Sequence, residues 1–430
     1  IILLIFYSNI FIMKSVKVIL KNGLKYEGIL VDKKEDFIIL KLQNGYNIGL
    51  KLDEIEKIEE YDIEYRKKYK EIQKKNENKD KISIIATGGT ILSKVDYRTG
   101  GVDILSKPEE IFEIFPELFD LVDIKEIKIP FSIASEDMTP EEWKKIAVIA
   151  EELLNDKETK GIIILHGTDT MHYTSAALSF MLRNLNKPVA LTGSQRSSDR
   201  PSTDAYLNIF SSAVFSLSEI AEVSVVMHGS IEDKFCYAHR GTRVRKMHTE
   251  RRDTFQSIND LPLAKIYGKN IEIINKNFRK RNNEKVFADV SINENVAIVK
   301  TYPGSDPGII YYYTDKGYKG IVIEGTGFGH VPTKTLNKEK SWINAIKYAR
   351  DLGVIFVMTS QTIYGRTNPF VYSNARILYD LGVIYAEDML TEVAYVKLMW
   401  VLGHTEKYED VKRLMLTNIA NEISERSQYI

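Results

Sequence analysis

The sequence has very little cysteine. Cys236 is the single cysteine among 430 residues, which excludes a disulfide framework and any zinc or iron–sulfur site built from several cysteines. This cysteine usage fits a reducing compartment, so we expect a cytoplasmic protein.

An excess of charge of either sign is also missing. Lys plus Arg and Asp plus Glu both number 59, so the formal net charge is zero. Attraction of the whole protein to nucleic acid is therefore excluded, and any RNA contact requires a local basic patch. A chain of this length that is 44% hydrophobic and 27% charged is typical of a globular protein with two or three domains.

Long hydrophobic runs are scarce. The apolar stretch at residues 1–12 is too short for a bilayer core of about 30 Å. It also lacks the basic flank and small-residue cleavage site of a signal peptide. We expect residues 1–12 to be an over-extended start, with Met13 as the natural first residue; a genuine apolar arm is the alternative. No membrane partner is expected.

Residues 13–60 predict a small β domain. Five short strands, with Asn-Gly turn signals between some of them, are expected at residues 16–20, 26–31, 37–42, 44–50 and 55–58. This pattern is typical of an SH3-like or Sm-like β-barrel. Such barrels bind RNA, peptides or other protein chains, so the fold does not choose among these functions.

The chain changes character after the barrel. Residues 61–80 are almost all polar or charged and predict a linker. From residue 81, strands alternate with helices, which predicts an α/β body with parallel sheets covered on both faces. We expect an N-terminal α/β domain at 81–285 and a C-terminal one at 286–430. The latter would close with helices near 391–403 and 408–424, and Leu182 is expected in the helix that follows the strand at 162–165.

The loops after the strands carry the chemistry. In parallel α/β sheets ligands bind at the carboxyl ends of strands. There the sequence has Thr-Gly-Gly-Thr at 87–90, Ala-Ser-Glu-Asp at 134–137 and His-Gly-Thr-Asp-Thr at 166–170. Each loop alone reads as a helix cap, but several hydroxyl-rich loops converging from neighbouring strands indicate a binding or catalytic site.

Thr90 is the candidate nucleophile. The glycines before it allow close approach of the backbone to a ligand, and a threonine hydroxyl needs a base to attack. Thr168 and Asp169 lie on a neighbouring loop, where a lysine beside the carboxylate would serve as proton acceptor. Spacing alone does not choose that lysine.

Other motifs give weaker signals. The glycine-rich segment 325–329 lacks the full dinucleotide-binding spacing, and a P-loop is absent. The histidines show no His-Glu-x-x-His pattern, so no metal site is expected.

Two motifs carry a resemblance to a known family. Residues 86–91, Ala-Thr-Gly-Gly-Thr-Ile, and 165–171, Leu-His-Gly-Thr-Asp-Thr-Met, resemble the two signatures of the bacterial-type L-asparaginases, and the likeness extends over residues 81–430. The resemblance implies a two-domain body in which Thr90 is the nucleophile and Thr168, Asp169 and a lysine form the second catalytic group. The segment 245–255, with Asp253 and Phe255 at its end, is similar to the family's lysine segment and selects Lys246. The resemblance further implies substrate binding by Gly89, Ser135, Glu136 and Gly167.

The N-terminal extension and the segments 195–204 and 240–248 are similar to a narrower family, the D subunits of archaeal glutamyl-tRNA(Gln) amidotransferases. That resemblance implies a glutaminase that supplies ammonia to a partner, the E subunit, in an assembly of two D and two E chains, with a D–D dimer through the asparaginase-like body. The partner would bind the tRNA and use ATP and Mg²⁺, so no cofactor is expected in this chain. Tyr97 lies closer to Thr90 than the flap tyrosine of free asparaginases, and its role stays open.

Two alternatives accompany this hypothesis. One is a free cytoplasmic L-asparaginase that carries an accessory barrel, and the other is a non-catalytic RNA-binding scaffold. Dependence on a partner and on charged tRNA separates the first alternative from the amidotransferase. The choice between glutamine and asparagine stays open, because one methylene in a pocket is worth only about 1–3 kcal/mol.

Overall fold

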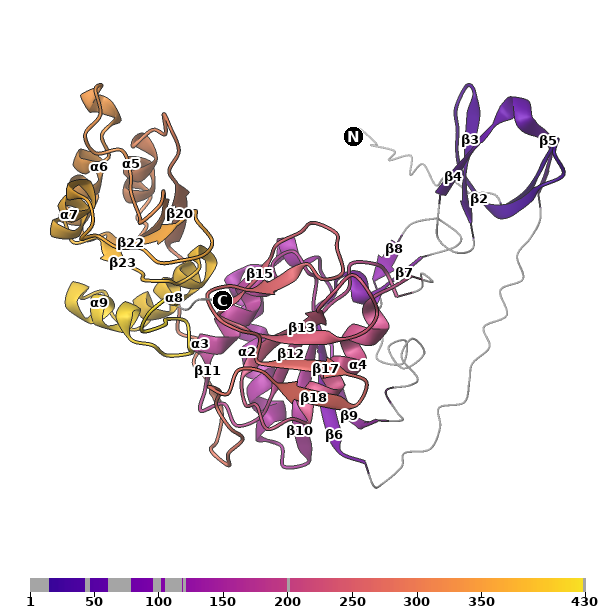
Figure 1. Cartoon of the computed structure of the whole chain (residues 1–430), viewed down its shortest axis with the longest axis horizontal. Coiled ribbons are helices and arrows are strands. Elements are labelled where there is room, and N and C mark those ends of the chain that lie inside the picture. The colour runs from indigo at the N-terminus through magenta and orange to yellow at the C-terminus, as the bar shows by residue number, and fades with distance from the viewer. Residues whose placement is uncertain are drawn as a thin grey trace, which may run out of the picture.

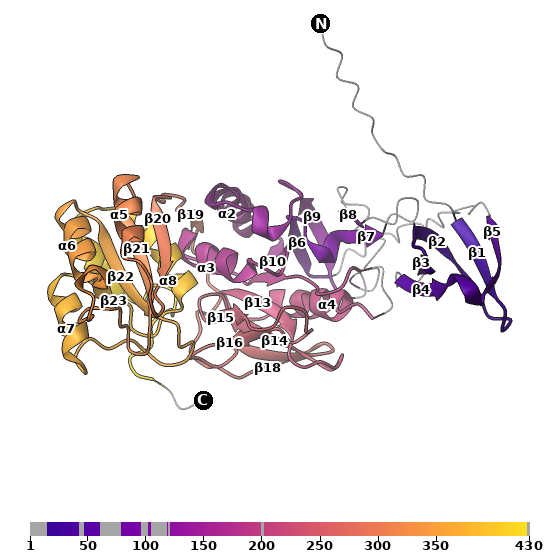
Figure 2. The same cartoon turned by 90° about the horizontal axis from the view of Figure 1, so that it is seen from above.

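The computed structural model describes residues 15–42, 47–60, 79–95, 102–104, 118, 121–198 and 202–427. The predictions for residues 1–12, for most of the linker at 61–80 and for Tyr97 lie outside these residues. Figures 1 and 2 show a small β domain, a central α/β domain and a C-terminal α/β domain that follow one another along the molecule. No helix in the described part of the chain is long and apolar enough to cross a membrane.

The N-terminal domain is a curved antiparallel sheet of five strands in the order β4-β3-β2-β1-β5. Gly23, at φ +85°, closes the β1–β2 turn that the Lys-Asn-Gly sequence predicts. Alternate residues of β1, among them Val16 and Val18, are buried in a core of this domain's own. The strands are β1 (Ser15–Leu20), β2 (Lys25–Lys33), β3 (Phe37–Leu42), β4 (Asn47–Lys51) and β5 (Ile55–Glu60), with the 3-10 turn η1 (Leu52–Glu54) before β5.

The central domain is built on an eight-stranded sheet in the order β18-β17-β14-β13-β12-β10-β6-β9. The five strands from β13 to β9 are parallel, as the alternation of strands and helices predicts. Beyond β13 the sheet continues antiparallel through β14, β17 and β18, which the sequence pattern did not reveal. These strands are β6 (Lys81–Ala86), β9 (Asp123–Lys128), β10 (Thr159–Leu165), β12 (Val189–Thr192), β13 (Val223–His228), β14 (Cys236–Arg240), β17 (Ala264–Tyr267) and β18 (Asn270–Ile273).

Helices cover both faces of this sheet. Along β10, Ile162 and Ile164 pack in the core that contains α2 and α3, whereas Ile163 and Leu165 pack with α4 on the opposite face. The helices are α2 (Pro140–Asn155), α3 (Met171–Met181) and α4 (Ala205–Ser216). Helix α2 begins with the capping box and proline that its sequence predicts. Short elements complete the domain: η2 (Thr90–Leu92), β7 (Ser93–Val95), β8 (Val102–Ile104), η4 (Ser135–Asp137), β11 (Leu182–Arg183), β15 (Val244–Lys246), β16 (Phe255–Ser257) and β19 (Phe287–Ala288).

The C-terminal domain has a parallel four-stranded sheet in the order β20-β21-β22-β23. Helix α8 covers the face of this sheet that is turned to the central domain and packs against α3, so that one apolar core runs between the two domains. Phe180 of α3 stacks on Trp400 of α8 within it. The elements are β20 (Val296–Lys300), α5 (Gly308–Asp315), β21 (Gly320–Gly325), η5 (Lys338–Lys340), α6 (Ile343–Asp351), β22 (Ile355–Ser360), α7 (Ser373–Asp380), β23 (Ile384–Tyr385), α8 (Thr391–Leu402) and α9 (Tyr408–Leu416).

Two helix boundaries differ from the sequence prediction. Leu182 is not in helix α3 but in β11, where it pairs with Ala288 of β19. The last helix, α9, ends at Leu416 rather than near residue 424. It stops there because the buried Lys397 ammonium binds the carbonyl oxygens of Met415 and Thr417, at 2.8 and 2.7 Å, in place of further helical N–H groups.

Candidate active site

The order of the parallel strands places a binding site between β6 and β10. Along the chain, β9 is added on one side of β6 and β10 on the other, so the direction of strand addition reverses at β6. In open α/β sheets the crevice at this switch point, outside the carboxyl ends of the strands, is where ligands bind. The loops after β6, β9 and β10 all leave the sheet at the carboxyl ends of these parallel strands, next to the crevice.

Glycines allow these three loops to touch. Gly89 has φ +84°, and a Cβ there would lie 2.5 Å from the Cα of Gly167 in the loop after β10. A Cβ on Gly167 would in turn lie 2.8 Å from the side chain of Ser135, which follows β9. Real Cβ atoms do not approach this closely, so the contact between the three loops requires glycine at both positions.

Thr90 lies directly beside this contact. It begins the 3-10 turn η2 and is half-buried, while the next two residues, Ile91 and Leu92, are buried in the core and anchor the turn. The loop is also tied to β10, because the backbone N–H of Thr87 donates to the carbonyl of Leu165 at 3.0 Å. The candidate nucleophile therefore sits on a short and well-anchored turn at the switch point.

Lys246 reaches the loop after β10 from a distant part of the chain. Its Nζ donates to Thr168 Oγ1 at 2.9 Å and to Asp169 Oδ1 at 2.6 Å. The lysine side chain is 10% exposed, whereas that of Asp169 is 62% exposed. Strand β15 carries Lys246 and pairs with β16, with Lys246 opposite Phe255. A hydroxyl, an ammonium and a carboxylate in a continuous chain of hydrogen bonds can move a proton to or from a neighbouring reacting group.

Ser135 and Glu136 form the third side of the site. Ser135 is buried, and it accepts from Thr170 twice: its Oγ from the backbone N–H at 3.4 Å and its carbonyl from the hydroxyl at 2.7 Å. The carboxylate of Glu136 is exposed and lies 3.5 Å from the Ser135 hydroxyl. This pair offers a hydroxyl and a negative charge to the polar end of a small ligand.

His166 is buried beside the site. Its Nδ1 lies 2.6 Å from the carbonyl of Gly167 and its Nε2 lies 2.8 Å from Thr174 Oγ1. Complete burial lowers the pKa of His166 to about 4, so the imidazole is neutral at pH 7. In the described part of the chain, no group of three or more His, Cys, Asp or Glu side chains is arranged to hold a metal ion.

The structure thus brings together Gly89, Thr90, Ser135, Glu136, Gly167, Thr168, Asp169 and Lys246, whose catalytic and binding roles stay predictions. Sequence reasoning missed two arginines, Arg245 on the lysine strand and Arg243 directly before it, and the acidic residues of the C-terminal domain that they contact. The signal was present in the alternation Arg-Val-Arg-Lys at 243–246, which places both arginines on the face of a strand opposite to the lysine.

Comparisons with known proteins agree with this architecture. Residues 81–279 match the family model "Asparaginase, N-terminal", residues 295–415 the model "Glutaminase/Asparaginase C-terminal domain", and residues 13–60 the model "GatD N-terminal domain". The structure is similar to the thermostable L-asparaginase from Thermococcus kodakarensis, with a TM-score of 0.72 and 31% identity over 80% of this chain and 99% of that one. It is also similar to L-asparaginase I from Vibrio cholerae, with a TM-score of 0.68 and 30% identity over the same shares.

Relatives of nearly the same length are closer in sequence. The D subunit of glutamyl-tRNA(Gln) amidotransferase from Pyrococcus abyssi is 51% identical over 412 residues, which cover 94% of this chain and 92% of that protein. The corresponding protein of Thermococcus kodakarensis is 50% identical over 426 residues, 96% of this chain and 94% of that protein. These matches include the N-terminal domain as well as the α/β body, and the chain therefore belongs to the family of glutamyl-tRNA(Gln) amidotransferase D subunits.

Proposed function

We propose that this chain is the glutaminase component of a Glu-tRNA(Gln) amidotransferase and releases the ammonia that a partner uses to convert Glu-tRNA(Gln) to Gln-tRNA(Gln). The observation that carries the proposal is the convergence of Lys246 on Thr168 and Asp169 beside the Gly89–Gly167 contact. It occurs in a chain whose residues 13–60 match the N-terminal domain of the D subunits.

The reaction follows from the residues at the switch point. The Thr90 hydroxyl attacks the side-chain amide carbon of the substrate and loses its proton, and the amide nitrogen leaves as ammonia once it has gained a proton. The resulting ester is hydrolysed by water, which yields glutamate and restores Thr90. Lys246, held between Thr168 and Asp169, is in a position to handle protons in both steps.

The loop after β9 orients the substrate. Glu136 presents an exposed carboxylate to the α-ammonium group of glutamine, while the Ser135 hydroxyl beside it binds the α-carboxylate end. Gly89 and Gly167 let the loops after β6, β9 and β10 touch, which keeps Ser135 close to Thr90.

The assembly that we propose contains two D and two E chains, with a D–D dimer through the asparaginase-like body. The E subunit binds and activates Glu-tRNA(Gln) with ATP and Mg²⁺, so this chain meets the tRNA through its partner and needs no cofactor of its own. The proposed location is the cytoplasm, where charged tRNA is used.

The test is ammonia release from glutamine and from asparagine, measured with this chain alone, with its partner (the E subunit), and with the partner, ATP, Mg²⁺ and Glu-tRNA(Gln) together. We expect glutamine hydrolysis to rise when the partner and charged tRNA are added, together with formation of Gln-tRNA(Gln). Hydrolysis of asparagine at full rate without any partner, and no stimulation by tRNA, would instead support a free L-asparaginase. That alternative rests on the two L-asparaginase structures, each matched over 99% of its length.

A further inference from the structure

The strand that carries Lys246 has two faces that turn to different domains. Side chains alternate along a β-strand, and Val244 and Lys246 face the central domain, where Val244 is buried in the core and Lys246 contacts Thr168 and Asp169. Arg243 and Arg245 alternate with these two residues and therefore lie on the opposite face. Both of these arginines form ion pairs with carboxylates of the C-terminal domain.

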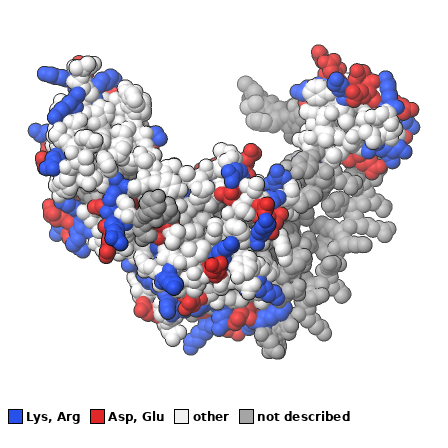
Figure 3. Space-filling model, in the orientation of Figure 1, with Lys and Arg blue, Asp and Glu red and all other residues white. Residues whose placement is uncertain are grey.

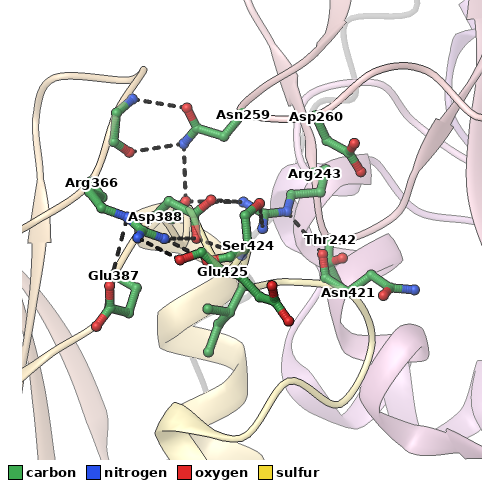
Figure 4. Close-up of polar contacts among 12 residues, drawn as sticks. Thr242, Arg243, Asn259, Asp260, Arg366, Glu387, Asp388, Asn421, Ser424 and Glu425 are labelled. Atoms are coloured by element: carbon green, nitrogen blue, oxygen red, sulfur yellow. Dashed lines mark hydrogen bonds and ion pairs between the residues drawn. The ribbon is translucent and has the colours of Figure 1, made fainter. Parts of the chain in front are cut away.

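Arg243 is almost completely enclosed, with 1% of its surface exposed. Its Nη1 donates to Asp388 Oδ2 at 3.0 Å and to the Asp388 carbonyl at 3.2 Å, where Asp388 follows β23. Its Nε and Nη2 each donate at 2.9 Å, to the carbonyl of Asn421 and to the hydroxyl of Ser424 after α9. Figure 4 shows the guanidinium between these groups, which come from two separate segments of the C-terminal domain.

Arg245 makes a second link between the domains. Its Nη1 lies 3.6 Å from Oε2 of Glu392, a buried carboxylate in the first turn of α8. The Arg245 side chain itself is 32% exposed. Burial raises the pKa of Glu392, and the nearby guanidinium opposes that shift. The other carboxylate oxygen, Glu392 Oε1, is 3.9 Å from Nε2 of His172 on α3.

The opposite strand of the hairpin is fastened to the same domain. Asn259, two residues after β16, donates through Nδ2 to the carbonyl of Gly365 at 3.1 Å and accepts from the Gly365 N–H at 2.9 Å. Its Nδ2 also lies 3.1 Å from the carbonyl of Asp388. Figure 4 shows Asn259 and Arg243 directed at the same segment of the C-terminal domain.

The hairpin of β15 and β16 needs these contacts with the C-terminal domain for a physical reason. Strands β15 and β16 have three residues each and form a sheet of their own, outside the eight-stranded sheet. An isolated two-stranded hairpin is marginally stable in water, so contacts with neighbouring elements determine where β15 lies. A displacement of about 1 Å of a catalytic group can cost about 10²-fold in rate.

We propose that Arg243 and Arg245 are positioning residues through which the C-terminal domain, by Asp388 and Glu392, holds β15 so that Lys246 stays against Thr168 and Asp169. The proposal rests on the glutaminase function given above. It gives the C-terminal domain a part in positioning Lys246, although the residues to which we assign catalysis and substrate binding belong to the central domain.

The variants compare ion pairs of the same type at different places. Arg245→Gln removes the charge of a partly exposed side chain, and Arg245→Lys keeps it. Asp388→Asn removes the charge opposite Arg243. The matched control is Glu222→Gln, because Glu222 pairs with the buried Arg240 at 2.8 Å entirely within the central domain.

The readouts are kcat and KM for glutamine in the complete complex, the pH profile of kcat, thermal unfolding, and the pH titration of the Lys246 side chain followed by NMR of isotopically labelled lysine. We expect Arg245→Gln and Asp388→Asn to lower kcat by about 10-fold to 100-fold, to change KM by less than twofold, and to shift both the kcat–pH profile and the Lys246 titration. Arg245→Lys should recover most of the kcat that Arg245→Gln loses. Glu222→Gln should unfold at a lower temperature while its kcat and Lys246 titration stay as in the wild type.

The proposal is wrong if Arg245→Gln leaves kcat and the Lys246 titration unchanged, or if Glu222→Gln lowers kcat as much as the interdomain variants do. The titration needs no substrate. If the wild-type complex failed to hydrolyse glutamine, the proposed function would fall, while a shifted Lys246 titration in Arg245→Gln would still support the positioning role. If Asp388→Asn does not fold, the comparison of Arg245→Gln with Arg245→Lys tests the proposal by itself.

Discussion

Lys246 and Asp169 form an ion pair with a separation of 2.6 Å although they lie on two loops far apart in the sequence. The pair joins a hairpin outside the main sheet to the switch point of that sheet. Because Thr168 Oγ1 also accepts from the same ammonium, the position of the lysine is defined by two contacts on one loop.

Removal of either Thr90 or Lys246 should abolish amide hydrolysis. We expect Thr90→Ala and Lys246→Ala each to lower kcat by at least about 10²-fold, since one removes the proposed nucleophile and the other the proposed proton-transfer group. Steady-state ammonia release measures the effect, and thermal unfolding shows that the fold is kept. The double variant should be little worse than either single one, because groups that act as a unit are not additive. Ammonia release near the wild-type rate from a folded single variant would remove that residue from the mechanism.

The carboxylate of Asp169 should matter through the lysine. Asp169→Asn keeps the size of the side chain but removes the charge that holds the Lys246 ammonium at 2.6 Å, so kcat should fall and its pH dependence should shift. The ion pair of the exposed Lys145 with Glu142 provides a control, in which Lys145→Gln should leave both quantities unchanged. Full activity with an unaltered pH profile in Asp169→Asn would exclude this role.

Gly89 is expected to tolerate no side chain. Gly89→Ala would place a Cβ 2.5 Å from the backbone of Gly167, so the loops must separate and kcat should drop by more than about 10-fold. Gly317→Ala is a matched control, because Gly317 has the same φ of +84° with no atom within 4 Å of its would-be Cβ. Both variants carry the cost of a strained backbone, about 1 kcal/mol. An equal and small effect of the two on kcat would show that the close contact is not needed.

Acid should destabilise the central domain through its buried histidines. Burial lowers the pKa of His166 to about 4 and that of His239 to about 3, from 6.5. The unfolded chain therefore takes up protons near pH 6.5 while the folded chain does not. The stability is fully present above pH 6.5 and falls as the pH drops toward 4, by up to about 1.4 kcal/mol per pH unit for each histidine.

Unfolding by urea between pH 7 and pH 5 measures this slope. His239→Gln should make it shallower, because this variant removes one of the buried imidazoles whose pKa is lowered. A slope that is equal in the wild type and in His239→Gln would mean that the imidazole of His239 takes up its proton over the same pH range in the folded and the unfolded chain.

The N-terminal β domain should act in assembly and not in hydrolysis. It has its own core and sheet, and its lysines are balanced by nearby acids, for example Lys17 by Glu27. On the face of the molecule in Figure 3, basic and acidic residues of this domain are interspersed, which favours docking against protein over direct binding to RNA phosphates. Deletion of residues 1–60 should leave glutamine hydrolysis largely intact and weaken tRNA-dependent amidation. Normal amidation by the truncated chain with its partner would show that the domain has no part in the coupled reaction.

Local patterns in the sequence predicted much of this structure. The Thr-Gly-Gly-Thr loop could be recognised because glycines next to a buried strand are needed wherever two loops touch through their backbones, as Gly89 and Gly167 do. Helix α2 could be predicted from the sequence, because its capping box at Thr139 and its apolar stripe lie within one segment. These features depend on neighbours in the sequence, so the sequence displays them.

Features that depend on distant partners were not predictable from spacing. Lys246 was selected by resemblance, because nothing local distinguishes it from other lysines of the chain. The end of α9 at Leu416 depends on Lys397, which belongs to another helix. The alternation at 243–246 indicates on which face of a strand the arginines lie, but it does not identify Asp388 as the partner of Arg243. Two residues on separate domains carry no joint signal in a single sequence.

The interdomain contacts of β15 have a consequence for the synthesis of the protein. Lys246 leaves the ribosome long before Asp388, Glu392 and Ser424, the residues that hold its strand. Domains tend to fold in the order in which they are made, so a nascent chain already displays Thr90, Thr168 and Asp169 while the lysine strand still lacks its support. If these contacts position Lys246 as proposed above, a chain that still lacks its C-terminal domain should hydrolyse glutamine slowly, so incomplete chains would consume little of the amide donor.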